Sequence, residues 1–164
     1  MKITSHSNNK GENEVIAILP VGILVKKEYK DIRKIILKDH TLSAVITMPK
    51  DLFYPNASVN TAVVIFKSGI KYDFNKKVWF HIMGDGFILK KHKGRVDSGK
   101  WNEVKLSIKQ DYMNKKVVDD SKNAFVKIDE DSEWIAESYI KVNFKEFVKK
   151  DIEQKVLDHN FLQS

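Results

Sequence analysis

The 164-residue chain contains no cysteine, only three prolines and no long apolar run. Without cysteine it has no disulfide framework, no thiolate metal site and no cysteine nucleophile. No apolar run reaches the roughly 18–20 residues that a membrane-spanning helix needs, and the first 13 residues lack the apolar core of a secretory signal. We therefore expect a cytoplasmic protein with no membrane association. The content of 42% apolar and 31% charged residues is typical of a globular domain and excludes collagen-like and disordered chains.

Arginine is scarce as well, because only two of the 29 basic residues are arginines. The formal net charge of +7 is uneven: residues 71–118 carry +7, residues 1–70 carry +4 and residues 119–164 carry −4. The middle part contains a basic cluster made of Lys90, Lys91, Lys93 and Arg95. Such a cluster attracts polyanions and suits contact with nucleic-acid phosphates. A solvated lysine-rich surface is the alternative, because arginine is the usual phosphate ligand.

The residue patterns of catalytic and metal centres are also missing. The five histidines are far apart and lack the spacing of metal ligands. No Ser or Thr lies in the context of a nucleophile elbow. Gly84 and Gly86 form a lone GxG pair that a turn explains. The residue types alone therefore predict no catalytic or metal site.

Residues 15–67 have the pattern of an α/β unit. Apolar, β-branched runs at 15–19, 42–48 and 59–66 predict strands buried in a covered, mostly parallel sheet. An apolar stripe over residues 28–39 predicts a helix between the first two strands. Three strands and one helix leave such a sheet unfinished, and no later segment predicts a strand that completes it.

The pattern changes after residue 70. Residues 78–82 and 87–89 flank a turn that contains two glycines, which predicts a hairpin. Helices are predicted over 101–118 and, with Asn143 as the N-cap, over 143–156. Residues 134–140 predict a short helix or an extended segment.

Four blocks in the first half resemble one known family. They are VIAILPVGILV (15–25), IRKIIL (32–37), LSAVITMPKDLFYP (42–55) and NTAVVIF (60–66). In this order, with short spacers, they resemble the modification (M) subunit of type I restriction-modification systems, an N6-adenine DNA methyltransferase. The resemblance implies an α/β fold with a partial methyltransferase-like (Rossmann-like) sheet, a hairpin and C-terminal helices. Its expected parts are a flexible leader (1–13), the C-terminal part of the methyltransferase domain (14–70) and a hairpin with a helical region (71–164).

The resemblance also implies what the chain lacks. Enzymes of this family bind S-adenosylmethionine on a Gly-containing turn and hold the target adenine with an Asn/Asp-Pro-Pro-Tyr/Phe motif, and both normally precede these blocks. The chain has no Pro-Pro pair. We therefore expect no catalytic residue and no bound cofactor in this chain, although the intact family enzyme uses S-adenosylmethionine. Alone it would be inactive, since neither reactant would be positioned.

One site carries over from the family as an expectation. In similar methyltransferases an aromatic ring in the loop before the last paired strands stacks on the flipped target base, which has lost its neighbours in the duplex. The matching residues are Tyr54 and Phe53. The alternative is that both rings only plug the end of the sheet. Lys90, Lys91, Lys93 and Arg95 are the expected contacts to the DNA backbone.

The expected function is that of a fragment or truncated homologue of the methylation subunit. It would complete the methyltransferase sheet, contact DNA and dock on the specificity and other subunits of a restriction-modification complex. An exposed sheet edge would also allow self-association. The alternatives are a stand-alone, non-catalytic DNA- or protein-interaction module derived from that family, and a split enzyme whose partner holds the methyl donor.

Overall fold

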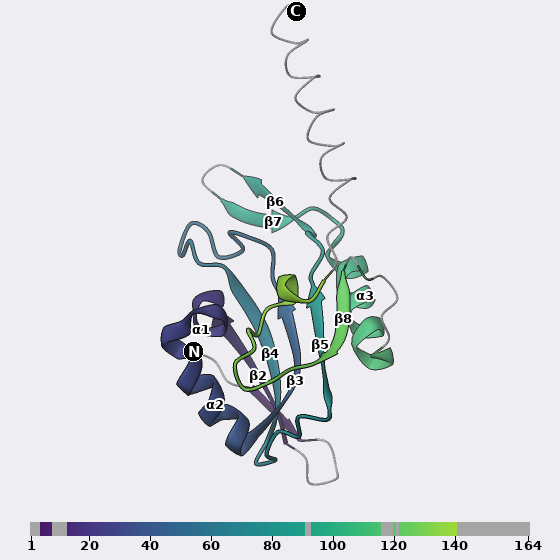
Figure 1. Cartoon of the computed structure of the whole chain (residues 1–164). Helices are drawn as coiled ribbons and strands as arrows, with labels where there is room; N and C mark the ends of the chain where they lie inside the picture. Colours follow the sequence, from purple (N-terminus) through teal and green to yellow (C-terminus); the bar gives the residue numbers. More distant parts are fainter. Residues whose placement is uncertain (1–3, 8–12, 91–92, 116–119, 121, 141–164) are drawn as a thin grey trace, which may run out of the picture.

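The computed structural model describes residues 4–7, 13–90, 93–115, 120 and 122–140. Figure 1 shows a central sheet with helices on both sides and a small separate hairpin. In chain order the elements are β1 (Thr4–Ser7), β2 (Asn13–Pro20), α1 (Val21–Val25), η1 (Lys27–Tyr29), α2 (Lys30–Asp39), β3 (His40–Thr47), β4 (Thr61–Ser68), β5 (Lys77–Ile82), β6 (Phe87–Lys90), β7 (Gly94–Asp97), α3 (Trp101–Asn114), β8 (Asn123–Lys127) and η2 (Ala136–Ser138).

The central sheet has six strands in the order β1-β2-β4-β3-β5-β8. Strand β4 runs antiparallel to both β2 and β3, so these two strands are parallel to each other, as the predicted strand–helix–strand unit requires. The link from β3 to β4, residues 48–60, contains no crossover helix, so β4 returns antiparallel. Of the five strand pairings in the central sheet, only β3 with β5 is parallel. The expectation of a mostly parallel sheet is therefore wrong.

The predicted pairing of residues 78–82 with 87–89 is wrong as well. Strand β5 lies inside the sheet between β3 and β8. Val78, Trp79 and Phe80 are all 0% exposed, so both faces of β5 are buried, as in a central strand. The hairpin is instead formed by β6 with β7. Because β5 and β8 extend the sheet beyond β3, the expectation that no later strand adds to it is also wrong.

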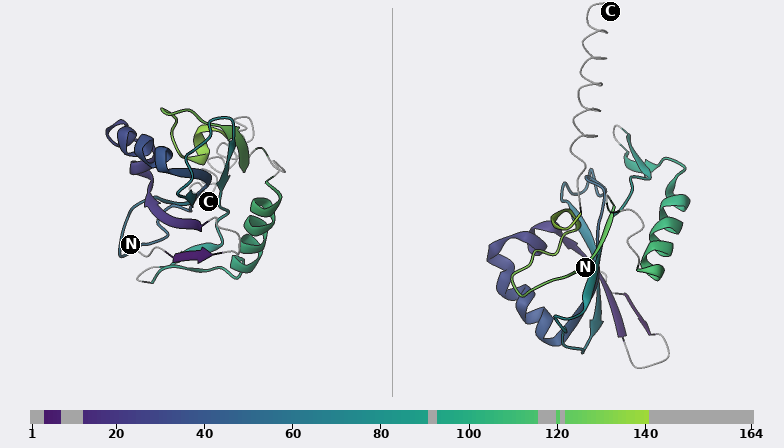
Figure 2. Two further views of the ribbon diagram at one scale, coloured as in Figure 1. Left: turned by 90° about the horizontal axis from the view of Figure 1, so that it is seen from below. Right: turned by 45° about the vertical axis from the view of Figure 1, so that its right-hand side comes forward.

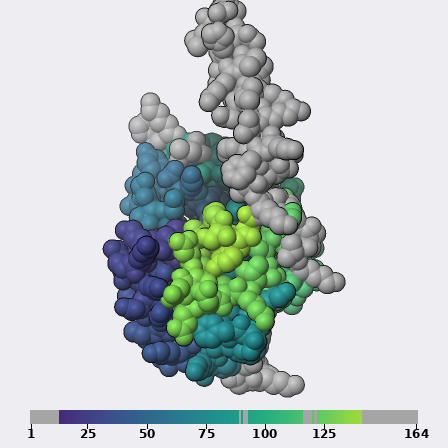
Figure 3. All heavy atoms as spheres, in the orientation of Figure 1, coloured from purple at the N-terminus to yellow at the C-terminus, as the bar shows by residue number. Residues whose placement is uncertain are grey.

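Two layers cover the sheet, one on each face (Figure 2). On the first face, α1 and α2 pack beside residues 128–140, and Leu24, Phe66 and Trp134 lie in the shared core. Figure 3 shows residues 128–140 crossing the middle of this face. On the second face, α3 packs over a core that includes Trp79 and Ile65. The described part of the chain is therefore a three-layer α/β/α arrangement.

Most of the predicted helices are present. Residues 28–39 correspond to η1 and α2, residues 101–118 contain α3, and residues 134–140 contain η2. The helix predicted over 143–156 lies outside the described residues. Strand β1 lies within the predicted leader. No helix among the described residues is both long and apolar enough to cross a membrane.

Candidate nucleic-acid interface

The loop between β3 and β4 carries the predicted aromatic pair at one end of the sheet. Phe53 is 38% exposed and Tyr54 is 45% exposed, so neither ring fills the sheet core. Two backbone hydrogen bonds shape the loop: the N–H of Tyr54 donates to the carbonyl of Asp51 (3.1 Å), and the N–H of Ala57 donates to the carbonyl of Phe53 (3.0 Å). The turn thus presents two aromatic rings to solvent.

The predicted basic residues lie on the β6–β7 hairpin, but they differ in what they contact. Lys90 and Lys93 are exposed, and Lys91 lies outside the described residues. The side chain of Arg95 is only 13% exposed. Its Nη1 is 2.8 Å from Oδ2 of Asp85, and its Nη2 donates to the backbone carbonyl of Lys50 at 2.7 Å. The two lysines can therefore reach a polyanion, whereas the guanidinium of Arg95 is bound to protein oxygens.

The hairpin and the aromatic loop are in direct contact. Gly94, the first residue of β7, has a φ of +71° and faces the loop. A Cβ added there would collide with the carbonyl oxygen of Tyr54 and lie 3.0 Å from Cδ of Pro55. The structure thus brings together the two segments that sequence reasoning singled out separately. The sequence does not predict this contact. Its one local sign is the glycine between Lys93 and Arg95.

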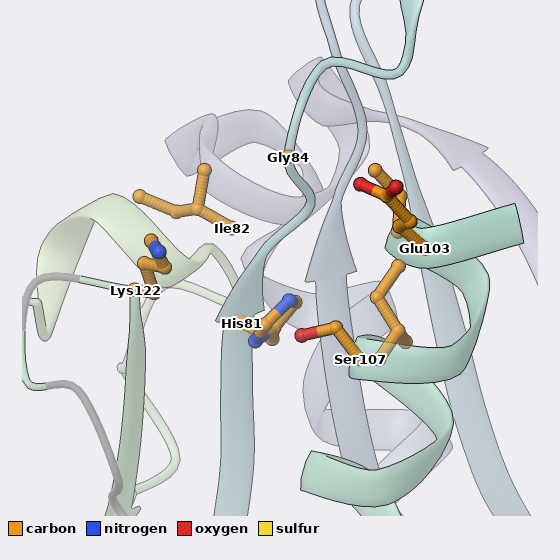
Figure 4. A pocket seen from close by; sticks show the side chains of 8 residues that line it. His81, Ile82, Gly84, Glu103, Ser107 and Lys122 are labelled. Carbon is orange, nitrogen blue, oxygen red and sulfur yellow. The ribbon is translucent and has the colours of Figure 1, made fainter. Parts of the chain in front are cut away.

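A hollow lies between β5 and α3 (Figure 4). It has a volume of about 230 Å³ and is lined by His81, Ile82, Gly84, Glu103, Val104, Ser107, Ile108 and Lys122. The hydroxyl of Ser107 points toward the ring of His81, which stacks on the ring of Trp79 at 4.9 Å between centroids. The hollow is therefore mostly apolar, with a buried imidazole in its wall.

His81 was not singled out from the sequence, although its place within the apolar run of residues 78–82 indicates burial. The residue is 3% exposed. Burial lowers the pKa of His81, and the nearby carboxylate of Asp111 opposes that effect only in part. The imidazole is therefore neutral near pH 7. The described residues contain no group of three His, Cys, Asp or Glu that could hold a metal ion.

The turn after β2 contains a glycine, Gly22. A close approach of backbone to a nucleotide-like ligand needs a glycine whose missing side chain leaves room for it. At Gly22 an added Cβ would meet only the end of the Lys26 side chain, at 3.6 Å. The helix that begins here, α1, has five residues. Neither the surroundings of Gly22 nor the short helix after it marks this turn as a ligand site.

The family model of the N-6 DNA methylases matches residues 1–156. The chain belongs to this family. A curated relative is the type II restriction enzyme and methyltransferase RM.BcgI of Heyndrickxia coagulans, which is 44% identical over 89 residues. That match covers 52% of this chain but only 14% of RM.BcgI. The chain thus spans a small part of the length of this relative.

Solved structures show the same fold. The methyltransferase subunit of a type I restriction-modification system from Streptococcus thermophilus superposes with a TM-score of 0.59 at 20% identity, covering 77% of this chain and 26% of that subunit. A chain from a study of complex assembly in the type I system superposes with a TM-score of 0.57 at 14% identity. This match covers 95% of the present chain and 35% of that chain. A modification subunit of a type I enzyme from Vibrio vulnificus superposes with a TM-score of 0.55 at 11% identity. This match covers 82% of the present chain and 28% of that subunit. The resemblance to type I methylation subunits is thereby confirmed, and the partial coverage fits a fragment.

Proposed function

We propose that this chain supplies the target-base side of an N6-adenine DNA methyltransferase in a restriction-modification system. The ring of Tyr54 stacks on the extruded adenine with Phe53 beside it, and Lys90 and Lys93 contact the DNA backbone. The methyl donor is held by protein outside this chain. The observation that carries the proposal is the exposed aromatic pair at the sheet end, in contact with a basic hairpin.

Stacking is the physical reason for an aromatic at this place. A base taken out of the duplex loses the stacking of its two neighbours, and an aromatic face restores part of it. Tyr54, at 45% exposure, presents more ring surface than Phe53 at 38%. The rings are held by a loop at the end of a six-stranded sheet, which limits how far they can move. A fixed, exposed ring is suited to receive a base.

Lysines on the hairpin supply the sequence-independent part of binding. Lys90 and Lys93 are exposed ammonium groups near the aromatic loop, and each phosphate contact releases a condensed counterion. The affinity for DNA should therefore fall as the salt concentration rises. Arg95 is not assigned a phosphate, because both of its Nη atoms already donate to protein oxygens.

Assembly with other subunits is the second part of the proposal. The structural relatives are components of type I restriction-modification systems. We propose that this chain likewise docks on a specificity subunit and on the part that holds the donor, with self-association through a sheet edge as a weaker contact. A stand-alone interaction module is the other candidate, because layers on both faces of the sheet give the described residues their own core.

The proposal is tested with a short DNA duplex that contains one unpaired 2-aminopurine. An unpaired base costs less to extrude than a paired one, and stacking on an aromatic ring quenches its fluorescence. We expect the chain to quench the signal at low salt. Stacking contributes about 1–3 kcal/mol per base, so Tyr54→Ala should weaken the quenching titration roughly 5- to 150-fold.

Two matched variants complete the test. Tyr54→Phe keeps the ring and should behave like the unmodified chain. Phe74→Ala removes another exposed ring (37%) from the β4–β5 link at the opposite end of the sheet and should have no effect. If Tyr54→Ala left the quenching unchanged, the base-stacking proposal would be rejected. Salt-dependent binding without quenching would favour the non-catalytic module instead.

A further inference from the structure

We infer that Gly94 and Arg95 are positioning residues that hold the Tyr54 loop against the β6–β7 hairpin. Together they form a two-point contact, called here the loop clamp: the close approach of Gly94 to Tyr54 and Pro55, and the bond from Arg95 to Lys50. The inference rests on the proposed function, since it concerns how the stacking residue is oriented. It assigns to the hairpin a role beyond that of carrying lysines.

Gly94 is required at its position for two independent reasons. Its φ of +71° lies in the left-handed region that favours glycine. In addition, a side chain there would run into the backbone carbonyl of Tyr54. Gly69 and Gly99 also have positive φ, of +72° and +88°, but a Cβ at either would meet nothing within 4 Å. Among these three glycines, Gly94 alone combines the backbone requirement with a close contact.

Arg95 connects three separate segments through one guanidinium. Its Nη2 donates to the carbonyl of Lys50 at the start of the loop. Its Nη1 donates to Asp85 and, at 3.3 Å, to the carbonyl of Phe87. Asp85 is itself fixed, because its Oδ1 accepts the N–H of Phe87 at 3.0 Å. The planar guanidinium serves these acceptors from two separate nitrogens, an arrangement that the single ammonium nitrogen of a lysine does not reproduce.

The loop has few other ties that would set its direction. Its internal hydrogen bonds, to Asp51 and Phe53, define the shape of the turn but not its orientation on the sheet. At its two ends, the N–H of Met48 donates to the carbonyl of Thr61 at 3.0 Å, and the carbonyl of Asn60 accepts the N–H of Val21 at 2.9 Å. The contacts of Gly94 and Arg95 therefore orient the part of the loop that carries the exposed rings.

The consequence for binding is preorganisation. A loop that is ordered only on contact with DNA pays its conformational entropy at that moment. With the loop held in advance, that cost is already met in the free protein. Because the exposed lysines are on the same hairpin, the clamp also fixes the distance between the phosphate contacts and the stacking ring. The clamp therefore holds the lysines that contact the DNA backbone and the ring that contacts the base in one fixed arrangement.

The test measures the loop directly by amide hydrogen exchange in the full chain. Gly94→Ala and Arg95→Lys should each speed exchange of the loop amides of Tyr54 and Ala57 roughly tenfold, the change expected when about 1.4 kcal/mol of local stability is lost. Quenching of unpaired 2-aminopurine by the same variants should weaken at least several-fold. Amides in β3 and β4 should keep their protection.

Gly99→Ala and Lys105→Gln are the matched controls. Gly99→Ala places a side chain at an equally unfavourable φ with no collision, and Lys105→Gln removes an exposed cation from α3. Both should leave loop exchange unchanged. The clamp is rejected if loop exchange in Gly94→Ala and Arg95→Lys matches the controls, or if it rises only in step with exchange in β3 and β4.

The conservative variant separates geometry from charge. If Arg95 acted as a phosphate contact, Arg95→Lys would retain the unmodified exchange and quenching, and that result would also overturn the clamp. Failure of the proposed function has a different signature: quenching that does not depend on Tyr54 in the otherwise unmodified chain. Loop exchange then still decides whether the clamp exists.

Discussion

At the scale of single residues, the two arginines have the same task. Arg33 is 2% exposed, and its Nη1 donates to the carbonyls of Ile23 and Lys26, both at 3.0 Å. Arg95 donates to the carbonyls of Lys50 and Phe87. In both cases the guanidinium joins backbone segments. The basic cluster of the sequence suggested a phosphate ligand for Arg95, and its protein acceptors could not be foreseen because Lys50 lies 45 positions away.

His81 gives a residue-scale prediction for pH dependence. Burial holds the pKa of His81 below its ordinary value of 6.5 in the folded chain, so the unfolded chain binds a proton first as the pH falls. The stability that depends on neutral His81 is full above about pH 6.5. It is lost as the pH falls from there toward the lower pKa of the folded chain. Urea unfolding followed by tryptophan fluorescence should show this decline as the pH is lowered below about 6.5.

Substitution by a residue that does not titrate checks the source of that decline. His81→Gln should flatten the pH dependence, with a difference of up to about 1.4 kcal/mol for each unit by which the two pKa values differ. His40→Gln is the control, since Nδ1 of His40 only accepts the N–H of Gly69 at the chain's surface. A His81→Gln chain that declined as steeply as the unmodified one would contradict the assignment.

At the scale of elements, the sequence predicts helices and strands that form contiguous blocks better than it predicts which distant strands pair. β2, α2, β3 and β4 were predicted, because each is a contiguous apolar or amphipathic block. β8 was missed, and β5 was given the wrong partner. Their pairing depends on residues far along the chain, as in Ala44 opposite Trp79. The short helix α1 was also missed, since Pro20 and Gly22 resemble a plain turn.

The structure explains why two of the family blocks occur together. The block at 32–37 contains Arg33, whose bonds to Ile23 and Lys26 tie α2 to the segment after Pro20. Arg33→Met should remove both bonds and leave two carbonyls without this donor. Hydrogen bonds to a charged group contribute about 1.5–3 kcal/mol, and we expect a loss of that size in urea unfolding. Lys38→Met, an exposed cation on the same helix, should change stability by less than about 0.5 kcal/mol. Equal effects of the two substitutions would contradict this tie.

At the scale of the whole molecule, the second face of the sheet is covered only in part. Ile16 and Ile18 of β2 lie opposite Ile65 and Val63 of β4, yet they are 41% and 47% exposed. The apolar surface therefore continues beyond the part that α3 covers. The matched proteins are also much longer, since this chain spans 14% of RM.BcgI and 26–35% of the superposed subunits. Both facts support the proposal that this chain docks on the part that holds the methyl donor.

At the candidate site, the sequence predicts Phe53, Tyr54, Lys90, Lys91, Lys93 and Arg95 as contact residues. Phe53 and Tyr54 lie on the loop, Lys90, Lys93 and Arg95 lie on the hairpin that touches it, and Lys91 lies outside the described residues. The sequence did not reveal that Gly94 and Arg95 connect these segments, because that contact depends on a left-handed φ and on the direction of one side chain. Residue types can be read from local blocks, whereas their relative orientation comes from the fold.

Calorimetric titration of the chain with S-adenosylmethionine tests whether the donor site lies elsewhere. The protein sample is first shown to quench unpaired 2-aminopurine in a Tyr54-dependent manner, so that it is known to be competent. We then expect no saturable heat with S-adenosylmethionine, because the methyl donor is proposed to be held by protein outside this chain. Saturable binding with a micromolar dissociation constant would contradict the division of the enzyme into a donor-holding part and this base-contacting part.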